Sequence, residues 1–192
     1  MLETAILTTE DPVLFVENKL LYLLPVKDKK IFQDFELSKS PASLPIQGKP
    51  QGAGEAYILT LRSAPPPVLS IAAYGYMAEL ARQAILRLAY EREIFAQLVV
   101  LTQLSPFDIE PVLASTRLTG RLLTVEEGTF TLGWGAEVVA RAAESRDGQS
   151  LAFGRLAALD LPVPASGALE NQVLPSVEAI YQAAAKMIKS YG

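Results

Sequence analysis

The chain contains neither cysteine nor histidine in its 192 residues. Without cysteine it can form no disulfide and carry out no thiolate chemistry, which suits a reducing compartment. Without histidine it lacks the commonest general base near neutral pH and the commonest zinc ligand, so a Ser-His-Asp hydrolase or a histidine-based metal centre cannot be built from this chain alone. Catalysis would have to use carboxylates, lysine, tyrosine or a partner chain, and we assign no catalytic, cofactor-binding or metal-binding residue.

The sequence also has no excess of basic residues and no long uninterrupted apolar run. Seventeen lysines and arginines face 21 acidic residues, for a net charge of -4, which offers no electrostatic footprint for nucleic acid or an anionic membrane. The apolar stretch from residue 63 to 78 is interrupted by three prolines and a glycine and is shorter than a membrane span. The first residues show no secretory signal pattern, so we expect a cytoplasmic protein without nucleic-acid or membrane partners.

What the chain does contain is ample material for a packed core, with 50% hydrophobic and 20% charged residues. From Val68 onward, short apolar runs alternate with helical periodicity, which indicates an α/β fold with a parallel sheet covered by helices. The expected strands are Val68–Ala73, Ala96–Leu101, Leu122–Val125 and Leu151–Leu156, and the expected helices are Tyr76–Glu91, Asp108–Thr116, Gly135–Ser145 and Ser176–Ser190.

The region before Val68 has a different composition. Residues 38–54 are rich in serine, proline, glycine and glutamine, which indicates a connector or long surface loop. Residues 55–62 resemble a strand, and the short link from Ser63 to Pro67 predicts an antiparallel hairpin with the next strand at the sheet edge.

The most informative segment is Gly120–Arg141, in which an apolar strand leads into Glu126 and Glu127 and then into a glycine loop that opens a helix. Open α/β sheets place their binding crevices at the carboxyl ends of strands. Because adjacent residues of an extended segment point to opposite sides, the two glutamates cannot form a facing acid/base pair. Either they are solvated or hold loop amides and partner arginines, or one of them reaches a crevice.

The glycine loop itself, Gly133-Trp134-Gly135, has two interpretations. It could form a backbone nest for a phosphate at the helix N-terminus, but the third glycine of a dinucleotide motif is missing and the nearby glutamates would repel an anion. Tight packing of the helix on the sheet is the alternative. Trp134 is either an interface anchor or locally buried, and Tyr74 and Tyr76, at the end of another strand, are candidates for the same edge.

Several motifs occur in an order that resembles the C-terminal domain of transketolase-like thiamine diphosphate enzymes, above all the beta subunit of the decarboxylating component of 2-oxo-acid (pyruvate or branched-chain) dehydrogenase complexes. The motifs are DPVLFVENKLLY, LSIAAYGYMAELARQA, VVLTQLSPFDIEPVLAS, TGRLLTVEEGTFTLGWGAEVVAR and LDLPVPASGALENQVLPSVEAI. The resemblance implies a three-layer α/β/α domain with a mostly parallel five-stranded sheet and one antiparallel edge strand.

The resemblance also implies a domain division and a division of labour. Residues 1–26 resemble the end of a pyrimidine-binding domain, in which Val13–Val16 would be a strand; residues 27–54 are a linker or long loop, and residues 55–192 form the C-terminal-like domain. In this family thiamine diphosphate and magnesium lie between two other domains, so we expect this chain alone to bind neither, and both to occur only in a complete parent enzyme.

Two functions follow from these observations. The first is a non-catalytic assembly domain of a thiamine-dependent enzyme, which contacts a second copy or another subunit through Glu126–Trp134 and the terminal segments. The second is a free-standing small-molecule sensor with a crevice near Tyr74, Glu126 and Gly133. Independent enzymatic activity is a distant third possibility, with Glu126 or Glu127 as the general base.

Overall fold

The computed structural model describes residues 6–7, 12–25, 33–40, 55–145 and 150–190. The elements in these ranges, in chain order, are η1 (Lys19–Leu23), β1 (Phe35–Ser40), β2 (Ala56–Leu61), β3 (Leu69–Ala73), α3 (Gly75–Arg92), β4 (Ala96–Leu101), α4 (Glu110–Thr119), β5 (Arg121–Thr129), α5 (Trp134–Glu144), β6 (Ala152–Ala158), α6 (Gly167–Val173) and α7 (Val177–Ser190). The strand and helix alternation expected after Val68 is confirmed, with the short helix α6 in addition.

The strands form one six-stranded sheet in the order β1-β2-β4-β3-β5-β6. The neighbouring strands β4, β3, β5 and β6 are parallel to one another. In contrast, β2 pairs antiparallel with β4, and β1 pairs antiparallel with β2. The α/β class with a mostly parallel sheet is confirmed, but the sheet has one strand more than the five expected. The added strand, β1, lies within the range expected to be linker.

The hairpin expected between β2 and β3 does not form. β2 instead pairs with β4, with Ala56 opposite Leu101, and it is flanked by β1 on its other side. The prolines between β2 and β3 explain the difference, because they remove backbone donors and fix φ where a tight hairpin would need other values. The chain therefore passes over β4 before β3 begins.

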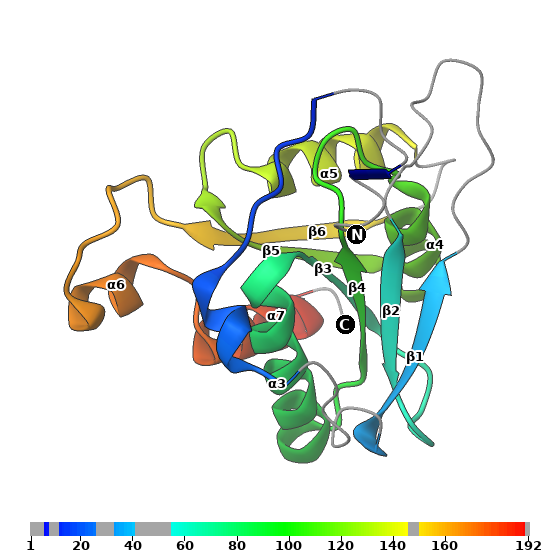
Figure 1. The fold of residues 1–192 in the computed structure, drawn as a ribbon. Coiled ribbons are helices and arrows are strands. Elements are labelled where there is room, and N and C mark those ends of the chain that lie inside the picture. The colour runs from blue at the N-terminus through cyan, green and yellow to red at the C-terminus, as the bar shows by residue number, and fades with distance from the viewer. Residues whose placement is uncertain (1–5, 8–11, 26–32, 41–54, 146–149, 191–192) are drawn as a thin grey trace.

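Helices cover both faces of the sheet, as Figure 1 shows. On one face, α3 and α7 pack on Leu69, Ile71 and Leu123; on the other, Val112 of α4 and Val138 of α5 pack on the remaining side chains of the same strands. Alternate residues of a strand point to opposite faces, so β3 and β5 are buried on both sides. The three-layer α/β/α arrangement follows from these two cores.

The helical periodicity expected for residues 76–91 is confirmed by α3. In α3, the buried positions are Met77, Ala81, Ala84, Ile85 and Leu88, which repeat at the i, i+3 and i+4 spacing of one helical face. α3 ends at Arg92, and the next residue, Glu93, caps it with a left-handed φ of 52°.

The start of α4 lies at Glu110, two residues after the start expected from the sequence. The Asp108 carboxylate accepts a hydrogen bond from the backbone N–H of Glu110 at 3.1 Å, and Pro111 lies in the first turn. A proline is tolerated there because its missing N–H would have no helical partner.

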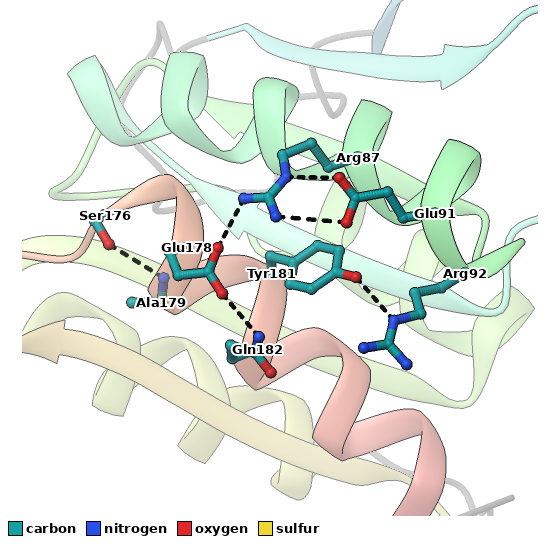
Figure 2. A network of polar contacts seen from close by, with 8 residues as sticks. All are labelled: Arg87, Glu91, Arg92, Ser176, Glu178, Ala179, Tyr181 and Gln182. Atoms are coloured by element: carbon teal, nitrogen blue, oxygen red, sulfur yellow. Dashed lines mark hydrogen bonds and ion pairs between the residues drawn. The ribbon is translucent and has the colours of Figure 1, made fainter.

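The C-terminal helix α7 is fixed to α3 by a polar network, drawn in Figure 2. Arg87 pairs with Glu91 at 3.1 Å and with Glu178 at 2.8 Å, and its guanidinium lies 4.5 Å from the ring centre of buried Tyr181. The Tyr181 hydroxyl in turn accepts a hydrogen bond from Arg92 at 2.8 Å. α7 is thus packed as part of the folded domain.

The N-terminal segment differs from the expectation. Residues 13–16 form no strand; the chain runs irregularly from Pro12 to Asn18 and then forms the 3₁₀ helix η1. The side chains of Leu14, Val16 and Leu23 are 89%, 76% and 80% exposed. In the part of the chain that the structure describes, no helix has the length and apolar character needed to cross a membrane.

Candidate functional site

The candidate site lies where β3 and β5 end side by side. Ala73 is opposite Val125 in the parallel register, so Tyr74 and Glu126 follow at the same edge of the sheet. The helix after β3, α3, covers one face, and the helix after β5, α5, covers the other. Neighbouring strands whose helices leave to opposite faces define the switch point of an α/β sheet, and Tyr74 and Glu126 lie at this point.

The two glutamates of the site face opposite ways, as the alternation predicted. Leu123 and Val125 pack into the core formed with α3 and α7. Glu126, one residue on, is turned to the α5 face and is 1% exposed. Glu127 points away from it and meets Asn18 of the N-terminal segment. The structure therefore does not bring the two carboxyl groups together as a catalytic pair.

Glu126 binds the start of α5. Its Oε1 accepts a hydrogen bond from the backbone N–H of Gly135 at 2.8 Å, while its Oε2 is buried and has no hydrogen-bond partner in the described part of the chain. Burial raises the pKa of Glu126, and hydrogen bonds from the backbone of Gly135 and Trp134, followed by the charge of Arg155, oppose this rise. The free N–H groups at the start of a helix need hydrogen-bond acceptors, and here the side chain of Glu126 supplies one.

The two glycines of the loop are explained by this contact. A Cβ on Gly135 would lie 2.5 Å from Thr124 Oγ1 and 2.7 Å from Glu126 Oε1, and one on Gly133 would lie 2.4 Å from the carbonyl oxygen of Thr129. No side chain larger than hydrogen fits at such distances. The glycine loop thus lets the carboxylate of Glu126 approach the backbone. A phosphate bound by the same backbone was the alternative interpretation of this loop.

Trp134 is held between two aromatic rings. The Tyr74 ring lies edge-on to the indole at 5.1 Å between centroids, and the Phe107 ring lies at 5.9 Å; both geometries are favourable for aromatic pairs. Burial raises the pKa of the Tyr74 hydroxyl, with a further rise from the charge of Glu126, while a hydrogen bond with the backbone of Gly128 lowers it. The indole Nε1 is buried and has no hydrogen-bond partner in the described ranges.

Tyr76 is not part of this group. It lies in the first turn of α3 and packs against the core on the α3 and α7 side of the sheet. Gly75, with a φ of +55°, lies between the two tyrosines and turns the chain from strand to helix. The two tyrosines therefore lie on different faces of the sheet.

Glu127 is half-buried and accepts two hydrogen bonds from Asn18 Nδ2, at 2.9 and 3.2 Å. Burial raises its pKa, the Asn18 hydrogen bond lowers it, and the charge of Glu170 raises it. Asn18 was not among the residues singled out in the sequence, because no local pattern connects positions 109 residues apart.

The loop between β5 and α5 is fixed by a second contact that sequence reasoning missed. Asp160, just after β6, accepts hydrogen bonds from the backbone N–H of Thr131 at 2.9 Å and from its hydroxyl at 2.6 Å. Arg155 binds the carbonyl oxygen of Phe130 and stacks 4.2 Å from its ring centre. The tip, Leu132, is 96% exposed and has a φ of 59°.

The described residues contain no group of three or more histidine, cysteine, aspartate or glutamate side chains that could hold a metal ion. The N-terminus of α5, where a phosphate could bind, is occupied by the Glu126 side chain. What the arrangement does chemically is to anchor a helix and pack three aromatic rings.

Comparison with known proteins gives matches over most of the chain. The model of the transketolase C-terminal domain family matches residues 60–180. The pyruvate dehydrogenase E1 component subunit beta of Pisum sativum is 32% identical over 91% of this chain and 44% of its own length. The beta subunit of the acetoin:2,6-dichlorophenolindophenol oxidoreductase of Cupriavidus necator is 34% identical over 93% of this chain and 47% of its own length.

A solved structure described as a split-gene transketolase, an inactive β4 tetramer, superposes with a TM-score of 0.58 and 26% identity, over 66% of this chain and 41% of that one. The chain spans less than half the length of the curated relatives named above. The matched range runs from β2 into α7 and contains the whole Glu126 site. The chain therefore belongs to the transketolase C-terminal domain family, with relatives among the beta subunits of 2-oxo-acid dehydrogenases.

Proposed function

We propose that this chain is a non-catalytic assembly domain of a thiamine-dependent 2-oxo-acid dehydrogenase or transketolase-like enzyme, and that it contacts a second copy or another subunit. The relatives are named as subunits of such enzymes, and the superposable transketolase is a tetramer of its own chains. Thiamine diphosphate and magnesium would then bind only in an assembly that contains the other domains. A cytoplasmic location stays a prediction, since several relatives are named as mitochondrial.

The observation that carries the proposal is apolar exposure at the edge where β5 ends. Leu14 and Val16 of the N-terminal segment and Leu132 of the glycine loop are each more than three-quarters exposed. Contiguous exposed apolar side chains mark protein interaction sites. The Asn18–Glu127 contact places the N-terminal segment beside the end of β5, and the glycine loop follows the same strand.

The burial and bonding of Glu126 support an assembly role of the domain over a catalytic one. Its carboxylate is buried and bound to the α5 backbone, and Tyr74 and Trp134 pack against each other. A general base needs a free path to the proton that it removes. The sensor alternative would need these same groups to turn towards a ligand, and it remains a prediction.

Native mass spectrometry of the purified chain, and of the chain captured from its own cells, tests the proposal. We expect a dimer or a complex with a thiamine-binding subunit. A chain that is strictly monomeric at high concentration and captures no such subunit would refute the assembly role. In a parallel thermal-shift screen, a metabolite that raises the melting temperature in proportion to the logarithm of its concentration would instead support the sensor.

A further inference from the structure

The N-terminal segment Pro12–Pro25 touches the rest of the domain in an unusual way. Every one of these residues is exposed except Asn18, which is half-buried. Leu21 and Leu24 are still 38% and 40% exposed, although η1 lies against α3 (Figure 1). These apolar side chains are thus only partly buried, and the hydrogen bonds that the structure gives between the segment and the sheet are made by one polar residue, Asn18.

The side chain of Asn18 bonds both to η1 and to strand β5. Its Oδ1 accepts a hydrogen bond from the backbone N–H of Leu20 at 2.9 Å and so caps η1. Its Nδ2 donates to both carboxylate oxygens of Glu127, at 2.9 and 3.2 Å. The cap is internal to the segment, whereas the donation to Glu127 is the attachment to the sheet.

The two partners differ in how firmly they are held. Glu127 belongs to β5, whose backbone is paired with β3 and β6 and whose preceding residues are fully buried. Within the described ranges, the backbone hydrogen bonds of the segment are local: the N–H groups of Leu21 and Leu24 donate to the carbonyl oxygens of Asn18 and Leu21. A region with few buried apolar contacts and exposed backbone hydrogen bonds opens at low free-energy cost.

We propose that Pro12–Pro25 is a detachable strap, latched to the domain through Asn18 and Glu127, which leaves β5 and α3 while the rest of the domain stays folded. On release, the leucine and valine side chains of the strap move away from the sheet edge, and Glu127 becomes exposed. The strap is a property of the single chain, so it stands or falls independently of the proposed assembly role.

The substitution Asn18→Asp tests the latch with little change of shape. Aspartate keeps the side-chain oxygen that caps η1 and is itself a preferred N-cap residue, but it replaces the donor to Glu127 by a second carboxylate. Asn171→Asp makes the same chemical change at an exposed position of α6 and is the matched control. Glu127→Ala removes the latch from the other side.

Hydrogen exchange measured by mass spectrometry on the isolated chain gives the readout. Asn18→Asp and Glu127→Ala are expected to increase exchange in peptides covering residues 12–25 about tenfold, the effect of one lost hydrogen bond to a charged group, with β3, β5 and α3 unchanged. Tryptic cleavage after Lys19 should accelerate in parallel, and Asn171→Asp should match the parent chain.

Two results would overturn the strap. Unchanged exchange and cleavage at residues 12–25 in both variants would mean that Asn18 and Glu127 do not hold the segment. Faster exchange throughout β3, β5 and α3 would mean that the segment is an integral part of the domain and does not detach alone.

Discussion

Replacing Glu126 by alanine removes the acceptor that holds the start of α5. Three effects combine in this variant. The buried N–H of Gly135 loses its partner, which costs about 1–3 kcal/mol. A void remains where a nearly fully buried side chain was, at a cost of about 2 kcal/mol or more in comparable truncations. The third effect is opposite in sign, because the variant no longer has to bury a carboxyl group.

The net expectation is a destabilisation of roughly 2–4 kcal/mol after this offset. At about 2–4 °C per kcal/mol for a domain of this size, the melting temperature should fall by roughly 4–16 °C. Glu126→Gln is the matched variant, since it keeps the shape and one carbonyl-type oxygen for Gly135. It should lose about 1 kcal/mol or less at neutral pH.

Thermal melts followed by circular dichroism measure the difference between the two variants, and hydrogen exchange of the Gly135 amide locates it. The alanine variant should show faster exchange at the first turn of α5, and the glutamine variant should not. The reasoning is refuted by an alanine variant that melts within about 2 °C of the parent chain. A glutamine variant as unstable as the alanine variant would show that charge at the helix N-terminus, and not the hydrogen bond, holds α5.

Three further predictions concern the same region. Because burial raises the pKa of Glu126, the folded state binds the proton of this side chain more tightly than the unfolded state does. The stabilisation from this proton is complete below about pH 4.3, the pKa of glutamate in the unfolded chain. It is lost as the pH rises through the pKa of Glu126 in the folded chain. The melting temperature of the parent chain minus that of Glu126→Gln should therefore fall with rising pH, and a constant difference would contradict this. Gly133→Ala should destabilise by about 1–3 kcal/mol through its 2.4 Å clash with Thr129, whereas Gly167→Ala, with nothing within 4 Å, should not; equal melts would count against the packing argument. Leu132→Asn should stabilise by about 0.5–1 kcal/mol, because asparagine tolerates the φ of 59° and a 96% exposed leucine has little contact to lose; a lower denaturation midpoint would oppose it.

Much of the fold follows from short-range patterns. The helical periodicity of α3 was readable because the spacing of a helix is a property of neighbouring residues. The opposed directions of Glu126 and Glu127 were readable for the same reason, since a strand alternates with a period of two. The glycine loop signalled a close approach of backbone and side chain, but not which group would approach.

The partners across the chain were decided by the tertiary structure. Pairing of β2 with β4, the strand β1 within a region of polar composition, and the Asn18–Glu127 bond all join segments separated by many residues. Such contacts form only when loop-closure entropy is offset by burial of whole faces, so no local window contains them. Periodicity in the sequence determined the α/β domain and placed polar residues after β5. Only packing decided that the Glu126 side chain occupies the N-terminus of α5.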